Sequence, residues 1–491
     1  MPQLSSSLFT ALIPIFYLTI LSVISLYSFH KILMIWRYHR YKHTIPQPLH
    51  TYADQDWPTI TIQLPIFNEM YVVERLLNAV TQLDYPLDKL EIQVLDDSTD
   101  ETQAICKHKV DALRDKHLNI HYIHRQHRKG YKAGALVHGL KSASGELVAI
   151  FDADFVPQSD TLRTMVNYFS DPTVGMVQAR WTHLNRDYSL LTELQALMLD
   201  GHFIIEQTTR HRAGCFFNFN GTAGIWRKQA IHDAGGWQHT TVTEDLDLSY
   251  RVQLKGWHCV YLPNLAVPAE LPMEMNAFKS QQFRWAKGSS QVAKLLLPSI
   301  LRADLPSHVK WEAFLHLTNN FNYLLLFAIL LLSYPYQFYL TEHHWQYSLL
   351  IYLPIFLVNT FNIFCFYFIS CSAQQGDRSW KLAYNIFFMM SLGIGITINQ
   401  SLAVCEGLLR SGTEFIRTPK HGVTTRQDSW ITKQYRAAKT QVLSLELLMM
   451  IYLSITTVFA IQQHHYLSLP FLVMFVVGYS YVINLSLFQS R

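Results

Sequence analysis

The chain has 491 residues, of which 49% are hydrophobic and 15% are charged, against about 25% charged residues in a typical soluble domain. This composition excludes an ordinary soluble protein and indicates segments within a lipid bilayer. The length also exceeds what one ordinary core accommodates. The formal net charge of +4 does not indicate a nucleic-acid partner. Six cysteines without CxxC spacing favour free thiols over a disulfide or zinc framework.

The first apolar segment, Leu8–Phe29, contains no charged residue. It lacks a basic region before it and an obvious cleavage site after it, so we interpret it as a membrane anchor and not a signal peptide. Its downstream flank is basic, with Lys31, Arg37, Arg40 and Lys42. The positive-inside rule therefore predicts that the chain from residue 31 onward lies in the cytoplasm, and we expect a multi-pass protein of a bacterial inner or plasma membrane.

Residues 51–310 have mixed polarity and are predicted to form a cytoplasmic catalytic domain after the anchor region 1–50. Short apolar runs rich in β-branched residues predict strands, at Thr59–Phe67, Leu90–Leu95, Ile120–Ile123 and Leu147–Phe151. The segments between them predict helices, at Glu69–Gln82, Glu101–Lys116 and Lys132–Ser142. Strands that alternate with helices indicate an α/β fold with a largely parallel, Rossmann-like sheet.

Polar clusters follow three of these strands, namely Asn68-Glu69, Asp96-Asp97 and Asp152-Ala153-Asp154. Ligands of open α/β sheets bind at the carboxyl ends of the strands, so the clusters predict a nucleotide pocket, with Pro65 in one wall. The alternative is that these side chains cap the following helices. Alternation within a strand predicts that Asp152 and Asp154 share one face, where two carboxylates could hold Mg²⁺ or Mn²⁺.

Three further groups of residues suit a nucleotide sugar. Lys132 opens a predicted helix whose N-terminal N–H groups favour phosphate, although the surrounding stretch is generally basic. Thr243-Glu244-Asp245 starts another helix, and Asp245 could act as a general base or merely cap that helix. In Gln281-Gln282-Phe283-Arg284-Trp285, the tryptophan offers a flat face for a sugar and Arg284 suits diphosphate, while an interfacial Trp/Arg belt is the alternative.

Residues 311–491 form the C-terminal membrane region and contain five apolar segments of membrane-spanning length: Phe321–Leu340, Tyr347–Ser372, Leu382–Cys405, Leu445–Ile461 and Leu467–Phe488. If all five crossed, the strongly basic stretch 407–440 would lie outside, against the usual charge bias. We therefore predict that residues 382–405 form an amphipathic helix at the cytoplasmic interface. The expected topology has one span before the catalytic domain and four after it, with the C-terminus inside.

The ordered set D-D, D-x-D, T-E-D and Q-x-x-R-W resembles the processive family 2 glycosyltransferases of the cellulose synthase superfamily. The sequence Q-Q-F-R-W-A-K-G-S is most similar to that of the branch that makes mannans and glucomannans. The resemblance implies a GT-A fold and an inverting, metal-dependent transfer from a nucleotide sugar. It assigns donor contacts to Asp97, Lys132 and Asp152, with Pro65, Asn68 and Glu69 nearby, and metal binding to Asp154.

The same resemblance implies that Asp245 is the catalytic base. The acceptor and diphosphate end would be lined by Glu244, Gln281, Arg284 and Trp285, with Gly221 and Thr222 in a loop beneath the terminal acceptor sugar. Within residues 411–426, the segment Phe415-Ile416-Arg417-Thr418-Pro419-Lys420 is similar to the F-x-x-T-x-K gating loop, which assigns Phe415, Thr418 and Lys420 to it. Arg417 departs from the usual valine, and the single predicted span before the catalytic domain argues against a cyclic-dinucleotide-controlled cellulose synthase.

The leading hypothesis is therefore transfer of a hexose, from UDP-glucose or GDP-mannose, to a growing β-glycan that leaves through the membrane region. One alternative is a non-processive enzyme with a membrane lipid as acceptor. Another is a transporter or scaffold whose nucleotide-like domain does no chemistry. Accessory subunits or a homo-oligomer stay open.

Overall fold

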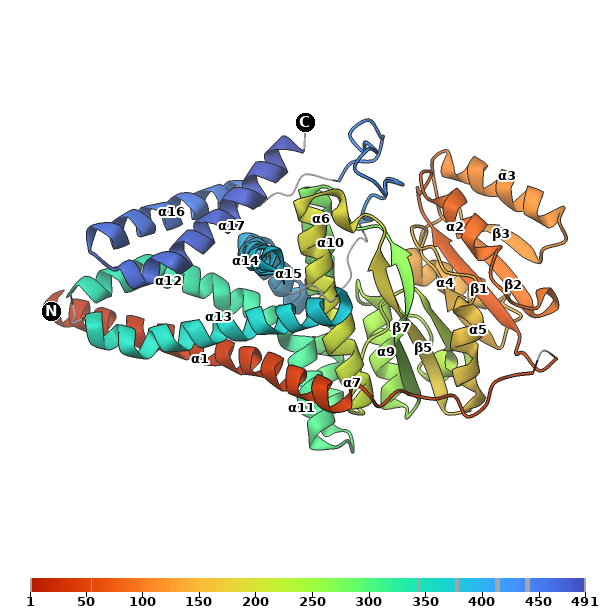
Figure 1. The fold of residues 1–491 in the computed structure, drawn as a ribbon, viewed down its shortest axis with the longest axis horizontal. Coiled ribbons are helices and arrows are strands. Elements are labelled where there is room, and N and C mark those ends of the chain that lie inside the picture. Colours follow the sequence, from red (N-terminus) through yellow and green to blue (C-terminus); the bar gives the residue numbers. More distant parts are fainter. Residues whose placement is uncertain are drawn as a thin grey trace.

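The computed structural model describes residues 2–53, 55–342, 345–375, 379–410, 416–437 and 442–489. The molecule is elongated, with a sheet-containing domain at one end and a bundle of long helices at the other (Figure 1). The N-terminus lies at the far end of the helical bundle (Figure 1). The chain therefore passes from the bundle into the sheet domain and back.

The sheet has seven strands in the order β3-β2-β1-β4-β6-β5-β7. The strands are β1 (Ile60–Ile66), β2 (Leu90–Asp96), β3 (Ile120–His124), β4 (Leu147–Ile150), β5 (Val174–His183), β6 (Gly224–Arg227) and β7 (His258–Ala269). The first four are parallel, β6 is antiparallel to both of its neighbours, and β7 is parallel to β5. Strand β2 is buried along its whole length, which explains its continuous apolar character.

Helices cover both faces of the sheet (Figure 1). They are α2 (Val73–Val80), α3 (Thr102–Arg114), α4 (Tyr131–Leu140), α5 (Thr161–Val166), α8 (Lys228–Asp233) and α9 (Glu244–Leu254). The first of these begins four residues later than predicted. Asn68 has φ +54°, so the chain turns at the end of β1 before the helix starts.

A second helical layer joins the sheet domain to the bundle. Helix α6 (Leu190–Asp200) continues through a π-helical turn, Gly201–Gln207, into α7 (Thr208–Arg212). Helix α10 (Met275–Arg302) is followed by α11 (Ser307–Thr318). These elements lie between the strands and the long helices (Figure 1).

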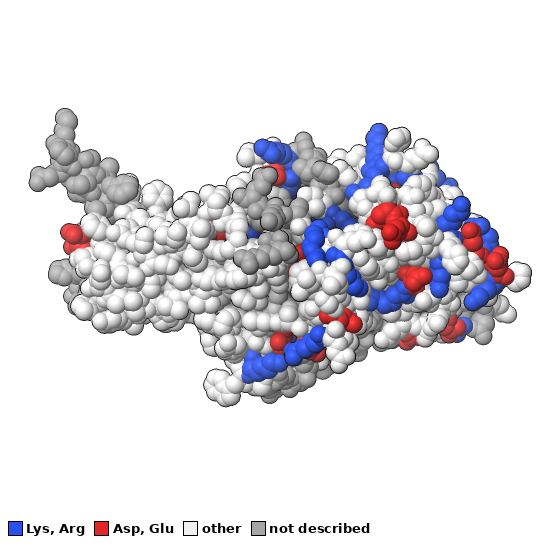
Figure 2. All heavy atoms as spheres, turned by 90° about the horizontal axis from the view of Figure 1, so that it is seen from above, with Lys and Arg blue, Asp and Glu red and all other residues white. Residues whose placement is uncertain are grey.

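Five helices of the described chain are long and apolar enough to cross a membrane. They run along α1 (Pro2–Tyr41), α12 (Asn322–Glu342), α13 (Trp345–Gln375), α16 (Leu443–Gln462) and α17 (Leu469–Phe488). One precedes the sheet domain and four follow it. On the face seen in Figure 2, Lys, Arg, Asp and Glu gather on the sheet domain and are almost missing from the bundle.

The segment predicted as one interface helix, 382–405, is two helices, α14 (Trp380–Gly395) and α15 (Thr397–Leu409), bent by 51°. Helix α14 is seen nearly end-on and thus runs across the long helices (Figure 1). Its last residue, Gly395, packs so closely on the backbone of Gly478 in α17 that neither position has room for a Cβ atom. The contact explains why small residues interrupt an otherwise apolar segment.

Candidate active site

The sequence motifs meet in one cavity of about 180 Å³ at the carboxyl ends of the parallel strands. Of the residues singled out from the sequence, the lining includes Pro65, Glu69, Asp97, Lys132, Asp152, Asp154, Gly221, Glu244, Asp245, Gln281, Arg284, Trp285, Thr418 and Lys420. Asp154 and Asp245, which are far apart in the chain, therefore face a common space. The arrangement is the one that a donor site built from separate strand ends requires.

Two of the predicted site residues lie elsewhere, and a third is not among the described residues. The side-chain amide of Asn68 donates to the hydroxyl of Thr99 and accepts from its backbone N–H, and Asn68 does not line the cavity. The hydroxyl of Thr222 is buried and accepts from the backbone N–H of Asp152 at 2.8 Å, so it positions the acidic motif from behind. Phe415 lies outside the described residues.

The two carboxylates of the D-x-D motif lie in a turn after β4 and not within the strand, so strand alternation does not account for their direction. Asp152 pairs with Lys132, which also donates to the carbonyl of Gly221 at 3.0 Å. Burial raises the pKa of Asp152, and Lys132 partly offsets this effect. Each acid thus has its own cationic partner, because Asp154 Oδ2 accepts from Lys420 Nζ at 2.7 Å.

Asp97 occupies the expected wall, but its carboxylate is already paired. Both of its oxygens accept hydrogen bonds from the guanidinium of Arg125, with Nε to Oδ1 at 2.7 Å. The direct nucleotide contact predicted for Asp97 would have to compete with this bidentate pair. Nearby, the guanidinium carbon of Arg128 lies 3.5 Å from the ring centre of Phe67, and both side chains line the cavity.

Asp245 stands in the first turn of α9, where its Oδ1 accepts the N–H of Leu246 at 2.8 Å. Burial and the neighbouring Glu244 raise the pKa of Asp245 to about 7. A Cβ atom at Gly221 would stand 3.0 Å from Oδ2 of this carboxylate, and Gly221 has φ +85°. Glycine therefore keeps the space before Asp245 open and satisfies the backbone conformation at once.

The Q-x-x-R-W residues lie on α10, which forms the side of the cavity nearest the bundle. Arg284 Nη1 donates to the backbone carbonyl of Ile416 at 2.9 Å, and burial lowers the pKa of this guanidinium. Gln281 and Trp285 line both this cavity and an adjoining one. Helix α10 thus lies at the border of the two cavities, and its side chains Gln281 and Trp285 face both.

The adjoining cavity has a volume of about 300 Å³ and extends toward the bundle. Its lining mixes aromatic rings with amide, imidazole and carboxylate groups, among them Trp181, Phe203, Tyr367, Gln195, His202, Asn220, Glu206 and Lys31. Flat rings beside hydrogen-bonding groups suit a sugar ring with its hydroxyls. Many charged side chains line the first cavity, whereas the second is lined by a mixture of aromatic, polar and charged side chains.

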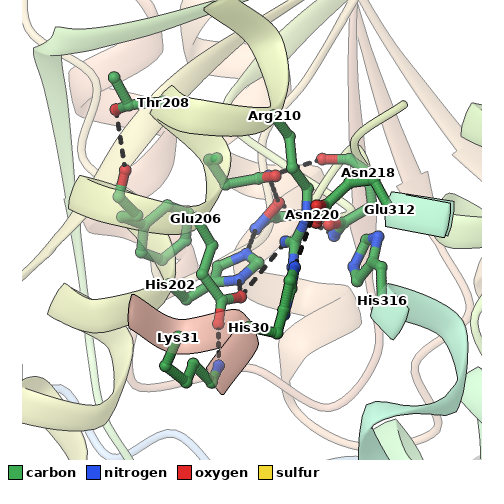
Figure 3. A network of polar contacts seen from close by, with 12 residues as sticks. His30, Lys31, His202, Glu206, Thr208, Arg210, Asn218, Asn220, Glu312 and His316 are labelled. Atoms are coloured by element: carbon green, nitrogen blue, oxygen red, sulfur yellow. Dashed lines mark hydrogen bonds and ion pairs between the residues drawn. The ribbon is translucent and has the colours of Figure 1, made fainter. Parts of the chain in front are cut away.

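A buried polar network contributes Lys31, His202, Glu206 and His316 to the lining of the second cavity. Figure 3 shows this network from close by. Glu206, in the π-helical turn, pairs with Lys31 of α1, with Arg210 at 3.2 Å and with His202 at 3.4 Å. Asn220 Nδ2 lies 3.0 Å from Nε2 of His202, and Asn220 directly precedes Gly221. The contacts therefore run from Lys31 of α1 to Asn220, whose neighbour Gly221 lies close to Asp245.

The network continues to α11 through Glu312, which pairs with Arg210 at 3.0 Å, with His30 at 3.0 Å and with Arg37 at 3.1 Å (Figure 3). Lys31 and Arg37 therefore face the protein interior, although they belong to the basic flank that predicts the orientation of the chain. Their charges are held by the carboxylates of Glu206 and Glu312.

Arg417 and Glu270 also line the first cavity, although neither was assigned a site role from the sequence. Arg417 forms an ion pair with Glu69 at 2.8 Å and lies over the ring of Tyr435, at 4.4 Å from its centre. Glu270 follows β7, and its backbone and side chain contact both the acidic motif and the segment that carries Lys420. Their contacts join positions far apart in the chain, which a local pattern cannot reveal.

The donor atoms available for a divalent cation are the carboxylates of Asp152 and Asp154 in the first cavity. Within the described part of the chain, no group of three or more His, Cys, Asp or Glu residues is arranged to hold a metal ion. Hard cations such as Mg²⁺ and Mn²⁺ accept one or two carboxylates together with substrate phosphates and water. Asp152 and Asp154 fit such a site, in which the protein supplies two carboxylates and the substrate and water supply the other ligands.

Comparison with known proteins adds independent findings. Residues 58–288 match the model described as "Glycosyltransferase like family 2". Glucomannan 4-beta-mannosyltransferase 1 of Oryza sativa is 36% identical over 387 residues, which cover 76% of this chain and 71% of that protein. Glucomannan 4-beta-mannosyltransferase 2 of Arabidopsis thaliana is 42% identical over 264 residues, covering 52% of this chain and 49% of that protein. Both relatives are plant proteins, so the comparisons do not support the expected bacterial membrane.

Among solved structures, the mannosyltransferase PcManGT from Pyrobaculum calidifontis, in complex with GDP-Man and Mn²⁺, aligns with a TM-score of 0.49 and 20% identity. The alignment covers 80% of this chain and 98% of that one, and at this level its ligands are not transferred to this protein. The family of this chain is shown by the match to the family model and by the extent of the match to the rice protein. This chain is a glycosyltransferase of family 2 and belongs with the cellulose synthase-like glucomannan 4-β-mannosyltransferases.

Proposed function

We propose that this enzyme transfers mannose from GDP-mannose to the end of a β-1,4-linked glycan, with inversion at the anomeric carbon. The observation that carries the proposal is the single cavity in which Asp154, Asp245 and Trp285 all take part. The donor and linkage follow the named activity of the plant relatives, which are 36–43% identical. UDP-glucose is the second donor to test.

In the proposed reaction, Asp245 removes the proton of the acceptor hydroxyl as that oxygen attacks the anomeric carbon of the donor. A pKa of about 7 suits a general base near neutral pH, since the carboxylate is then both ionised and basic. A Cβ atom at Gly221 would stand 3.5 Å from Lys132 Nζ, so this ammonium lies near the same space as Asp245. The carboxylates around Lys132 raise its pKa despite its burial. It therefore stays cationic and can support negative charge on the departing diphosphate.

Asp152 and Asp154 are the residues that would hold Mg²⁺ or Mn²⁺, which would offset the diphosphate charge when bound. Arg284 and Lys420 line the same cavity and can contact phosphate oxygens. Gln281 and Trp285, at the border of the two cavities, are proposed to hold the terminal acceptor sugar. Gly221 would form the floor beneath that sugar, and Thr222 would hold the acidic motif from behind.

The acceptor glycan is proposed to occupy the second cavity and to leave through the membrane region. A third cavity of about 290 Å³ supports this path. It shares Lys31 and Tyr323 with the second cavity and is lined further along by residues of α1, α12, α13 and α14. Under this proposal the sheet domain, 51–310, works on the cytoplasmic side, and α14 with α15 lies at that interface.

The test uses the full-length protein purified in lipid nanodiscs. It is incubated with radiolabelled GDP-mannose or UDP-glucose, β-1,4-mannooligosaccharides and Mn²⁺ or Mg²⁺, and the product is sized and its linkages determined. We expect a ladder of β-1,4-linked products from GDP-mannose, and none in EDTA. A single glycolipid would instead favour the lipid-acceptor alternative, and elongation by the purified chain would show that accessory subunits are not required. No turnover of either donor with either metal would contradict the proposal.

Membrane orientation is tested separately by a reporter tag at residue 425. The proposed topology places this residue on the same side as the catalytic domain, so the tag should be protected from reagents outside the cell. Labelling from the outside alone would reject this topology.

A further inference from the structure

Glu270 lies immediately after β7 and is 4% exposed, so almost none of its carboxylate reaches solvent. A carboxylate buried to this degree must be satisfied by hydrogen bonds or cations. Its partners come from three separate parts of the chain: the acidic motif after β4, helix α2, and the segment that follows Ile416. Glu270 therefore contacts all three of these elements at one place.

The backbone of Glu270 connects Asp154 with Lys420. Its N–H donates to Asp154 Oδ2 at 3.0 Å, and its carbonyl accepts from Lys420 Nζ at 2.6 Å. Lys420 Nζ also donates to the same Oδ2 of Asp154, at 2.7 Å. The three residues form a closed triangle of hydrogen bonds in the lining of the donor cavity, with the ammonium at one corner.

The side chain of Glu270 holds the turn that follows Lys420. The N–H groups of His421 and Gly422 both donate to its Oε2, at 3.3 and 3.1 Å. Gly422 has φ +64°, and a Cβ atom there would collide with the backbone carbonyl of Tyr71. Two successive N–H groups beside a left-handed glycine form an anion-binding nest, and the bound anion is Glu270 itself.

Helix α2 holds the carboxylate from the other side. Arg75 Nη2 donates to Glu270 Oε1 at 2.6 Å and reaches the backbone carbonyl of Asp154 at 3.4 Å. The carboxylate thus has a fixed cation on one oxygen and the turn of residues 421–422 on the other. Such an arrangement keeps the turn in place without using Lys420 as an anchor.

We propose that Glu270 is a positioning residue that docks segment 416–422 over the donor cavity and leaves Lys420 free to change partner. In the present arrangement the ammonium is bound to Asp154. When a donor enters, the ammonium moves to the diphosphate, while the backbone of the segment stays on Glu270. The inference rests on the proposed function for the nature of the donor, but the docking itself does not.

The test compares Glu270→Gln with Glu274→Gln as a matched control. Glu274 is 2% exposed and accepts the N–H of Ala437 at 2.7 Å, so it holds a later part of the same region of the chain. It is not among the residues that line the donor cavity. The two variants lose the same charge at neighbouring places, and only one loses the proposed docking point.

The first measurement is limited trypsin cleavage after Arg417 and Lys420 in nanodiscs, with and without GDP. We expect clearly faster cleavage in Glu270→Gln, with less protection by GDP, and wild-type rates in Glu274→Gln. The second measurement is donor kinetics, in which kcat/KM should fall about tenfold or more in Glu270→Gln, the range typical of residues that orient a site. Unfolding temperatures of both variants check that each is folded.

Gly422→Ala supplies a second way to break the same contact, from the segment instead of from the sheet domain. It should reproduce the faster cleavage even if Glu270→Gln does not fold. Wild-type cleavage in both Glu270→Gln and Gly422→Ala, or equal effects in Glu270→Gln and Glu274→Gln, would overturn the inference. Cleavage needs no turnover, so it decides this inference even where the donor assignment fails.

Discussion

The two adjoining cavities differ in how their charges are held. In the donor cavity, Asp152 and Asp154 are each paired with a single lysine, from α4 and from the segment after Ile416. At the junction with the bundle, Glu206 and Glu312 each pair with three cationic or imidazole side chains. Figure 3 shows part of this network. Single pairs can be exchanged for ligand charges, whereas a shared network resists the loss of one contact. We infer that the first set is for chemistry and the second is for structure.

The strongest way to break this comparison is Asp245→Asn. The amide keeps the shape of the side chain but cannot take a proton, so transfer should fall by about 10³-fold. GDP binding, measured by calorimetry, should stay close to wild type, because the proposed mechanism places Asp245 at the acceptor and not at the nucleotide. Full activity in this variant would refute the role of the base.

The pH dependence of transfer sharpens the assignment. Since the pKa of Asp245 is raised to about 7, the ionised fraction, and with it kcat, should fall by about tenfold for each pH unit well below 7. Above that value the rate should reach a plateau. Initial rates at saturating donor between pH 5 and pH 9 check this, and a rate independent of pH in the acidic range would contradict it.

Trp285→Ala tests the border between the cavities. Loss of the flat face should raise the KM for the oligosaccharide acceptor by roughly tenfold, or about 1.4 kcal/mol, and leave the KM for the donor unchanged. Trp285→Phe should restore part of the affinity, since a ring is retained. An equal effect on donor and acceptor would place this side chain at the diphosphate instead.

The smallest kinetic effect is expected for Glu206→Gln. Loss of the charge leaves Lys31 and Arg210 partly unpaired in a buried place, so the free energy of unfolding should drop by about 3–5 kcal/mol. The KM for the donor should stay near its wild-type value. Glu146→Gln is the control, because Glu146 pairs with Arg227 at the surface and is 58% exposed. Normal stability together with impaired transfer in Glu206→Gln would assign this residue to the chemistry.

Local patterns in the chain determine much of what is now visible. Runs of β-branched residues predict the four parallel strands with ends displaced by at most two residues, and apolar length predicts the helices α1, α12, α13, α16 and α17. Motif order predicts that strand ends carrying Asp97, Asp152 and Asp154 meet in one cavity. These features depend on period, length and strand polarity, which a linear sequence contains directly.

Other features exist only because distant segments pack together. The pairing of Asp97 with Arg125, the break between α14 and α15, and the contacts of Glu270 with residues 420–422 have no local signature. The same holds for Glu206, which lines the second cavity and pairs with Lys31 of α1 across 175 positions of the chain. Ion pairs and close backbone contacts of this kind depend on three-dimensional proximity. The amino-acid sequence therefore determines the chemical groups of this protein and the lengths of its apolar helices. The tertiary structure decides which carboxylates have a single partner that a ligand can replace, and which are fixed in a shared network.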